Sequence, residues 1–322
     1  MEMTAKLKER FCKDNSIQIK LFDEPYFTSR LELYDSEFNT ISLWNDFTKN
    51  VNAFSNEEEY FEQYNKAKDA AITFITSSPI FKEFNSMDMN KYAVPNEFRN
   101  LPGKDIYHSR NVGRTFISID MKKANFSSLR SFNKDVFDGA TTYEEFISKF
   151  TNISNIVKSK YVRQVIFGQC NCKRHITYEK YITGLFVKDL IDSGNVNLTD
   201  IVFFSNDEIV IDITSNTTAD KIDTLNEIQS TCESIVKKFN EVYSVPFRIN
   251  TFKLSEIIQD GTNIGYVRVM TDGSYDFKCL NHINLPWVLR KIKGEPITDY
   301  DLVFNYEGKL AKFMSIPTIE IK

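Results

Sequence analysis

The sequence is poor in the two residues that usually punctuate flexible or repetitive chains. Its 322 residues include only 11 glycines and 8 prolines, against average usage of about 7% and 5%. This composition excludes a collagen-like, low-complexity or linker-rich chain. With 27 phenylalanines and 15 tyrosines, the chain carries enough apolar side-chain area for a large core, and its length fits one large or two ordinary domains.

Cysteines and long apolar runs are also scarce. The five cysteines are scattered, and their odd number is unlike a secreted disulfide framework. The first residues are charged and lack the apolar stretch of a signal peptide. No uncharged apolar run approaches the ~18 residues that a membrane span requires. We therefore expect an intracellular, cytoplasmic protein with no membrane partner.

Acidic residues are sparse in the middle of the chain. The whole sequence has 40 Lys and Arg against 44 Asp and Glu. Residues 99–174 hold fourteen basic and six acidic side chains, a balance of +8 that leaves −12 for the rest. A basic segment within an acidic chain is typical of a surface that meets phosphates. The alternative is an ordinary solvated surface, and the acidic remainder is a candidate contact for a protein partner.

Hydrophobic periodicity and turn signals predict an α+β protein. The run at 115–120 is a buried strand that ends on Asp120, and 201–213 is a hairpin with acidic residues in its turn. On the helix at 156–169, the side chains of Lys160, Arg163, Gln164 and Phe167 fall on one face. Further strands are expected at 17–22, 30–34, 246–254, 265–270 and 275–280, a type I′ turn at 272–273, a loop within 81–103, and helices at 57–75, 143–150, 179–192, 218–243 and 287–293.

Three segments resemble motifs of palm-domain nucleic-acid polymerases. Residues 117–126 (ISIDMKKANF) resemble the first palm motif of reverse transcriptases, in which an Asp ends a strand. Residues 160–168 (KYVRQVIFG) resemble the fingers motif of family B DNA polymerases, with Gln164 for Asn and Phe167 for Tyr. Residues 203–210 (FFSNDEIV) resemble the third palm motif, an aromatic-led hairpin with adjacent acids. The resemblance covers roughly residues 110–255.

The resemblance implies a palm-type nucleotidyltransferase, a polymerase-like viral or phage protein that acts on nucleoside triphosphates and a nucleic-acid strand. Asp120 and Asp207 would ligate Mg²⁺ or Mn²⁺, with Glu208 as an auxiliary catalytic acid. Substrate-binding roles fall to Lys160, Arg163, Gln164, Phe167, Phe126 and Lys253. Within this group, the two basic helix residues would face the triphosphate, Phe167 the nascent base pair, Phe126 the sugar and Lys253 the leaving phosphates.

The implied fold is an antiparallel palm-like sheet of the RRM or ferredoxin-like type, with helices packed on one face. This core would span residues 106–258. A mixed α/β region at 1–105, fingers-like or accessory, would precede it, and a β/α extension at 259–322 would follow it.

Two positions depart from the motif pattern. Asn206 stands where the hairpin usually carries its first Asp, which shifts the metal site by one residue or removes it. Alignment on Phe126 would put Asn125 rather than Asp120 in the first motif. The alternative function is a catalytically degenerate palm protein that binds nucleic acid or protein. A third reading is a viral or phage accessory protein whose basic surface binds only a protein.

Other site signatures are weak. Cys170, Cys172 and His175 form a CxCxxH half-site, but no second half with zinc-like spacing follows. The sequence contains neither a P-loop nor a G-x-G-x-x-G motif. These observations favour structural cysteines and argue against the common nucleotide-binding loops.

Overall fold

The computed structural model describes residues 1–103, 106–216 and 222–322. It confirms the α+β class, because helices and one large antiparallel sheet share the chain. The helices are α1 (Ala5–Asn15), α2 (Tyr26–Phe38), α3 (Thr40–Val51), α4 (Glu57–Ser77), α5 (Pro79–Ser86), α6 (Ala124–Phe132), α7 (Tyr143–Ile147), α8 (Ser154–Lys158), α9 (Lys160–Gln169), α10 (Cys172–Asp192), α11 (Ile222–Lys238) and α12 (Leu285–Lys293). The strands are β1 (Thr115–Met121), β2 (Ile201–Phe204), β3 (Glu208–Asp212), β4 (Phe247–Gln259), β5 (Thr262–Met270), β6 (Tyr275–Lys278), β7 (Val303–Tyr306), β8 (Lys309–Lys312) and β9 (Ile319–Ile321).

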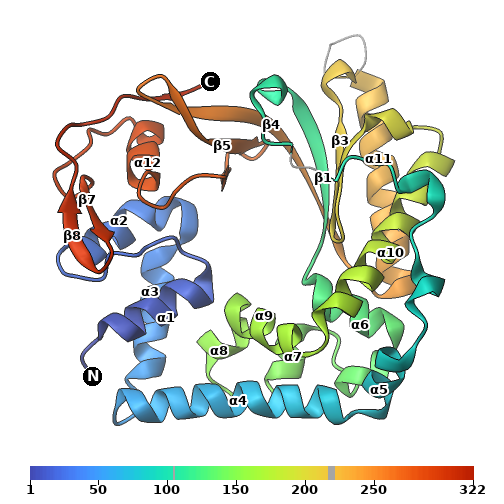
Figure 1. Ribbon diagram of the computed structural model, residues 1–322, viewed down its shortest axis with the longest axis horizontal. Helices are drawn as coiled ribbons and strands as arrows, with labels where there is room; N and C mark the ends of the chain where they lie inside the picture. The colour runs from blue at the N-terminus through green and yellow to red at the C-terminus, as the bar shows by residue number, and fades with distance from the viewer. Residues whose placement is uncertain (104–105, 217–221) are drawn as a thin grey trace.

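The large sheet has the strand order β2-β3-β1-β4-β5-β6, and β9 pairs with β4. Along the chain, β1 is followed by helices α6 to α10, then by the β2–β3 hairpin, α11 and β4. β1 therefore lies between two strands that come much later in the sequence, β3 and β4 (Figure 1). Strands β7 and β8 form a separate small hairpin.

The two faces of this sheet differ in chemistry, because successive side chains of a strand point to opposite faces. Ile117 and Ile119 of β1 belong to the main core, together with Phe186 of α10 and Cys232 of α11. On the other face, Phe116 packs in a smaller apolar cluster with residues of the 106–112 segment. Beyond that cluster, the same face carries polar and charged side chains toward the end of β1.

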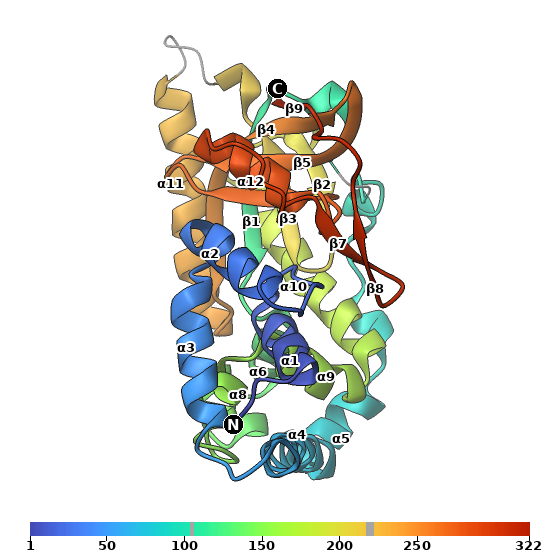
Figure 2. The ribbon, with the colours of Figure 1, turned by 90° about the vertical axis from the view of Figure 1, so that its left-hand side faces the viewer.

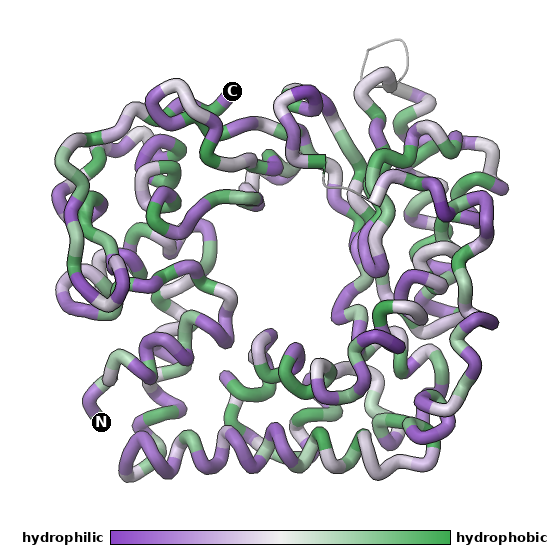
Figure 3. Tube along the Cα trace, viewed as in Figure 1, coloured by the Kyte–Doolittle hydropathy of each residue, from purple (hydrophilic) through white to green (hydrophobic). Residues whose placement is uncertain are grey.

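Several predicted elements are confirmed. The helix expected at 57–75 is α4, and Asn56 caps it by accepting a hydrogen bond from the Glu59 amide at 2.8 Å. Figure 3 shows hydrophilic and hydrophobic residues alternating along α4, as expected for a helix that buries one side. The strand at 115–120, the 201–213 hairpin and the strand from 246 are also confirmed.

Other predictions are wrong. Residues 30–34 lie inside α2, where Phe27, Leu31 and Tyr34 are buried at helical spacing. Residues 17–22 are extended and bury alternate side chains, but they belong to no strand. The helix expected at 156–169 is interrupted, because Ser159 ends α8 and caps α9. A loop does lie within 81–103, as expected, at residues 93–95 and 99–103, after α5 ends at Ser86.

Turn and boundary predictions have mixed outcomes. In the 272–273 turn only Gly273 has a positive φ, so this is not a type I′ turn. The predicted start of the long helix at 218 lies outside the described residues, and so does the boundary predicted after residue 105. The boundary predicted after residue 258 falls inside β4, which shares its sheet with β5.

Helices and sheet are arranged around the middle of the molecule. In Figure 1, α4 runs along the base, β1 and β3 rise on one side with α10 and α11, α1 to α3 rise on the other, and β4 and β5 run across the top. Figure 2 shows α4 end-on, with α12 above α2. A buried ion pair between Arg30 of α2 and Asp301 joins the N-terminal and C-terminal parts. Among the described residues, every helix is too short or too polar to cross a bilayer.

Candidate functional site

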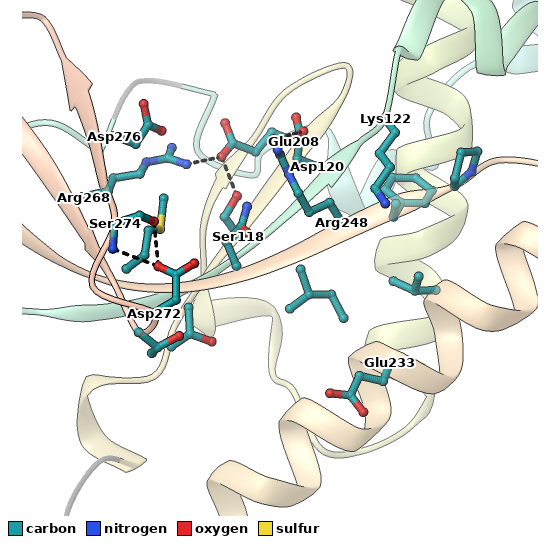
Figure 4. Close-up of a pocket in the computed structure, with 18 of the residues that line it drawn as sticks. Ser118, Asp120, Lys122, Glu208, Glu233, Arg248, Arg268, Asp272, Ser274 and Asp276 are labelled. Atoms are coloured by element: carbon teal, nitrogen blue, oxygen red, sulfur yellow. Dashed lines mark hydrogen bonds and ion pairs between the residues drawn. The ribbon is translucent and has the colours of Figure 1, made fainter. Parts of the chain in front are cut away.

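A cavity of about 1110 Å³ occupies the centre of the molecule. Residues of α2, β1, α9, β3, α11, β4, β5 and β6 line it, so segments from most of the chain contribute to one site. We call this site the central cavity. Its sheet wall consists of Ser118, Asp120, Glu208, Arg248 and Arg268 (Figure 4).

Three charged residues lie side by side across the sheet wall. In the strand register, Asp120 of β1 is opposite Glu208 of β3 on one side and Arg248 of β4 on the other. Side chains at directly opposite positions have Cβ atoms about 5 Å apart. Arg248 Nη2 donates to Asp120 Oδ2 at 2.9 Å. Burial raises the pKa of Asp120, Arg248 opposes this shift, and the nearby charges of Glu208 and Asp207 add to it.

Glu208 is held by two donors at one oxygen. Its Oε1 accepts from Ser118 Oγ at 2.6 Å and from Arg268 Nη1 at 2.9 Å. Arg268 is only 5% exposed and lies 4.6 Å from the centre of the Phe252 ring. Burial acts to lower the pKa of Arg268, but Glu208, Tyr107 and Asp276 together outweigh it and the pKa is raised.

The residues of the hairpin turn, 205–207, are not among those that line the cavity. Asp207 Oδ1 accepts from Ser205 Oγ at 3.1 Å, and the Asp207 carbonyl accepts from the Met121 amide at 2.8 Å. Asn206 Nδ2 donates to Glu179 Oε2 of α10 at 2.9 Å. Of the predicted acids, the structure therefore places Asp120 and Glu208 on the cavity wall, whereas Asp207 is not among the residues that line it.

Glu179 is buried beneath this turn. Its side chain is 2% exposed, and its Oε1 has no hydrogen-bond partner among the described residues. Burial raises the pKa of Glu179 to about 7, against the opposing hydrogen bond from Asn206, and the charge of Asp207 contributes to the rise. The turn is thus attached to α10 through an acid that titrates near neutral pH.

The residues predicted on α9 separate in the structure. Lys160 lines the central cavity and Gln164 is exposed. Arg163 is half-buried, 5.7 Å from the centre of the Tyr143 ring, and burial lowers its pKa. Phe167 is only 1% exposed and packs against Phe137.

The two remaining predicted residues lie outside the cavity. Phe126 is buried and stacks on Phe137, with ring centres 4.4 Å apart. In this conformation neither Phe126 nor Phe167 is accessible to a ligand. Lys253 is exposed and lies opposite Thr115, and it is not among the residues that line the cavity.

The basic segment at 99–174 contributes little positive charge to the cavity. Lys122 and Lys160 line it. Others serve the fold: Arg114 pairs with Asp212 and Lys123 with Glu144, while Arg130 and Arg174 bind backbone carbonyls. Over the whole cavity, six basic residues (Lys122, Lys160, Lys237, Arg248, Arg268 and Lys278) meet six acids (Glu37, Asp120, Glu208, Glu233, Asp272 and Asp276).

The donor set does not fit the expected Mg²⁺ or Mn²⁺ centre. These ions prefer oxygen ligands, and two-metal sites need several carboxylates free to bind. Within residues 1–103, 106–216 and 222–322, no group of three or more His, Cys, Asp or Glu is placed to hold a metal ion. Both carboxylates on the sheet wall are instead paired with arginines.

Three residues of the sheet wall were not predicted as site residues from the sequence: Ser118, Arg248 and Arg268. The sequence does carry a signal for Arg268, because it interrupts the apolar run YVRVM of β5, where a buried charge needs a partner.

Comparisons with protein-family models, with curated proteins and with solved structures find no match. The residues that line the central cavity are therefore the basis for a proposed function.

Proposed function

We propose that the protein binds nucleic acid in the central cavity as a palm-like protein without nucleotidyltransferase activity. The observation that carries this proposal is the pairing of Asp120 with Arg248 and of Glu208 with Arg268. Carboxylates that are paired with arginines are not free to bind metal ions. Among the charged residues that remain at the cavity surface, Lys122 and Lys160 can bind phosphate oxygens.

The order of the strands supports a palm-like relationship. β1, the helices after it, β2, β3, α11 and β4 follow one another as β-α-β-β-α-β, the pattern of ferredoxin-like folds. The neighbours β2-β3-β1-β4 place the end of β1 beside the hairpin. Motifs that resemble palm sequences therefore lie at adjacent positions of one sheet.

The lining of the cavity favours a nucleic-acid strand as its ligand. The cavity encloses about 1110 Å³, at the upper end of the size of small-molecule pockets, about 300–1,000 Å³. Phe38 and Tyr275 line it together with the lysines. Aromatic side chains next to cations are typical of single-strand binding sites, where bases stack and phosphates meet positive charge.

Fluorescence anisotropy with labelled single-stranded DNA and RNA tests this proposal. We expect binding that weakens steeply with salt. Lys160→Glu should weaken binding roughly tenfold or more, because it replaces a favourable phosphate contact with a repulsive one. Lys312→Glu is the matched control, since Lys312 pairs with the exposed Asp299 and does not line the cavity. If neither the single-stranded DNA nor the single-stranded RNA binds at low salt, the proposal is overturned.

Nucleotidyl transfer is the second candidate function. It is favoured by the register that sets Asp120 opposite Glu208 on the cavity wall. Primer extension with labelled nucleotides in Mg²⁺ or Mn²⁺ decides between the two. Product formed by the native protein and lost in Asp120→Asn would replace the binding proposal with the enzymatic one, whereas no product on any template would support binding alone.

A further inference from the structure

We infer that Arg248 is a metal-independent phosphate-binding residue and that Asp120 is its counter-ion in the unbound protein, displaced when a phosphate oxygen of the ligand takes its place. Arg268 neutralises Glu208 permanently. This inference rests on the proposed binding function and names the residues that meet the phosphate.

The two arginines are set up differently. The Arg248 side chain is 57% exposed, and its contact with Asp120 engages one of the five N–H donors of the guanidinium. The Asp120 side chain is 30% exposed, and a partly exposed ion pair is weaker than a buried one. Arg248 can therefore exchange Asp120 for a phosphate more readily than Arg268 can exchange Glu208. Arg268, by contrast, is buried against Phe252, and its partner Glu208 is also bound by Ser118. Breaking that pair would leave a buried charge without compensation.

The charges of the sheet wall cancel without an added ion. Asp120 and Glu208 are balanced by Arg248 and Arg268. Lys122 follows the end of β1 in a turn and lines the same cavity as Asp120. Its amide donates to the Pro246 carbonyl at 2.9 Å, close in sequence to Arg248. Figure 4 shows Lys122 and Arg248 on the same side of Asp120. Lys122 adds a basic side chain beside Arg248, and a phosphate can contact both without a metal bridge.

Replacement of Asp120 should change the phosphate affinity in opposite directions, depending on the role of this carboxylate. If Asp120 is a counter-ion, its removal frees Arg248 and strengthens phosphate binding. If Asp120 instead holds a metal that bridges to phosphate, its removal weakens binding. The two arrangements also differ in their response to chelators, because only a metal bridge is lost in EDTA.

The experiment measures the Kd of a labelled single-stranded oligonucleotide by anisotropy, in EDTA and in Mg²⁺. We expect native protein to bind equally well in both. Asp120→Asn should bind about threefold more tightly, the size of a partly exposed ion pair. Arg248→Gln should bind roughly tenfold more weakly, with a salt slope reduced by about 0.7 for the lost phosphate contact. Asp299→Asn, which removes one exposed acid outside the cavity, is the control for net charge.

The outcomes separate the inference from the function on which it rests. No binding by any variant overturns the proposed function. Binding that disappears in EDTA, that weakens in Asp120→Asn, or that tightens equally in Asp299→Asn overturns the inference and leaves the binding function standing. Arg248 is more than half exposed, so Arg248→Gln is expected to fold even where Asp120→Asn does not. Unchanged affinity in Arg248→Gln alone would also overturn the inference.

Discussion

At the scale of single residues, the aromatic ring of Phe167 serves the core of the helical half of the molecule. It lies edge-on to Phe137 at 6.0 Å between ring centres, and near Tyr143 and His175. The same helix exposes Gln164 to solvent. Phe167, which the sequence resemblance assigns to the nascent base pair, is therefore enclosed by other side chains.

Phe167→Ala should lower the free energy of unfolding by about 3–5 kcal/mol, because it removes a buried ring and leaves a cavity. Gln164→Ala on the same helix should change it by less than about 0.5 kcal/mol. Urea denaturation monitored by circular dichroism measures both values. Unchanged stability in Phe167→Ala would mean that the ring is free in solution, and its predicted contact with a nascent base pair would become the better assignment.

At the scale of elements, the β2–β3 turn is fixed to α10 by Asn206 and Thr183 as well as by Glu179. The raised pKa of Glu179 makes this attachment sensitive to pH. Since the folded protein holds the Glu179 proton more tightly than the unfolded chain does, its contribution to stability is fully present below the unfolded pKa near 4.5. It is lost as pH rises through the folded value of about 7.

We therefore expect the native protein to lose up to about 3 kcal/mol of stability between pH 4.5 and 8 through this group, at about 1.4 kcal/mol per pKa unit. Glu179→Gln keeps an oxygen that accepts from Asn206 and cannot ionise, so its stability should fall less over the same range. Asp192→Asn, an exposed substitution on the same helix, should retain the native pH profile. Parallel profiles for the native protein and Glu179→Gln would show that Glu179 does not titrate in this range.

The elements also mark how far the sequence could predict the structure. Periodicity and caps located β1, the hairpin, α4 and β4, because each of these signals is local. The strand expected at 30–34 failed because Leu31 and Leu33 alternate as in a strand. Both pack in the main core, which includes Leu285 and Leu289 of α12, far along the chain.

The candidate site was predictable only in part, for a related reason. Asp120, Glu208 and Lys160 follow from local motifs, and all three line the cavity. Arg248 and Arg268 reach the acids through the register of β4 and β5, which long-range pairing sets. The distinction between Asp207 and Glu208 depends on the same register, since only Glu208 is paired with Asp120 across the sheet.

At the scale of the whole molecule, closure of the chain around the cavity depends on the contact between α2 and α12. Asp301 is the centre of that contact: its Oδ1 accepts from Arg30 Nη1 at 2.8 Å and its Oδ2 from Arg290 Nε at 3.0 Å. Thr298 donates to the same carboxylate through both its amide and its hydroxyl, each at 2.8 Å. Lys293 adds a bond to the Leu33 carbonyl at 2.7 Å.

Asp301→Asn should destabilise the protein by about 3–5 kcal/mol, because it leaves Arg30 and Arg290 beside a neutral group in a buried site. Asp299→Asn, two residues away, removes an acid whose side chain is 84% exposed and should change stability by less than about 0.5 kcal/mol.

In Asp301→Asn, the backbone amides of α2 and α12 should both exchange hydrogen faster, since each helix loses the partner that covers it. Nucleic-acid affinity should fall as well, although every cavity side chain is unchanged, because Phe38 at the end of α2 lines the cavity and would lose its position. If only α12 exchanges faster, and α2 and the nucleic-acid affinity are unchanged, then α2 keeps its place beside the central cavity without the buried ion pair.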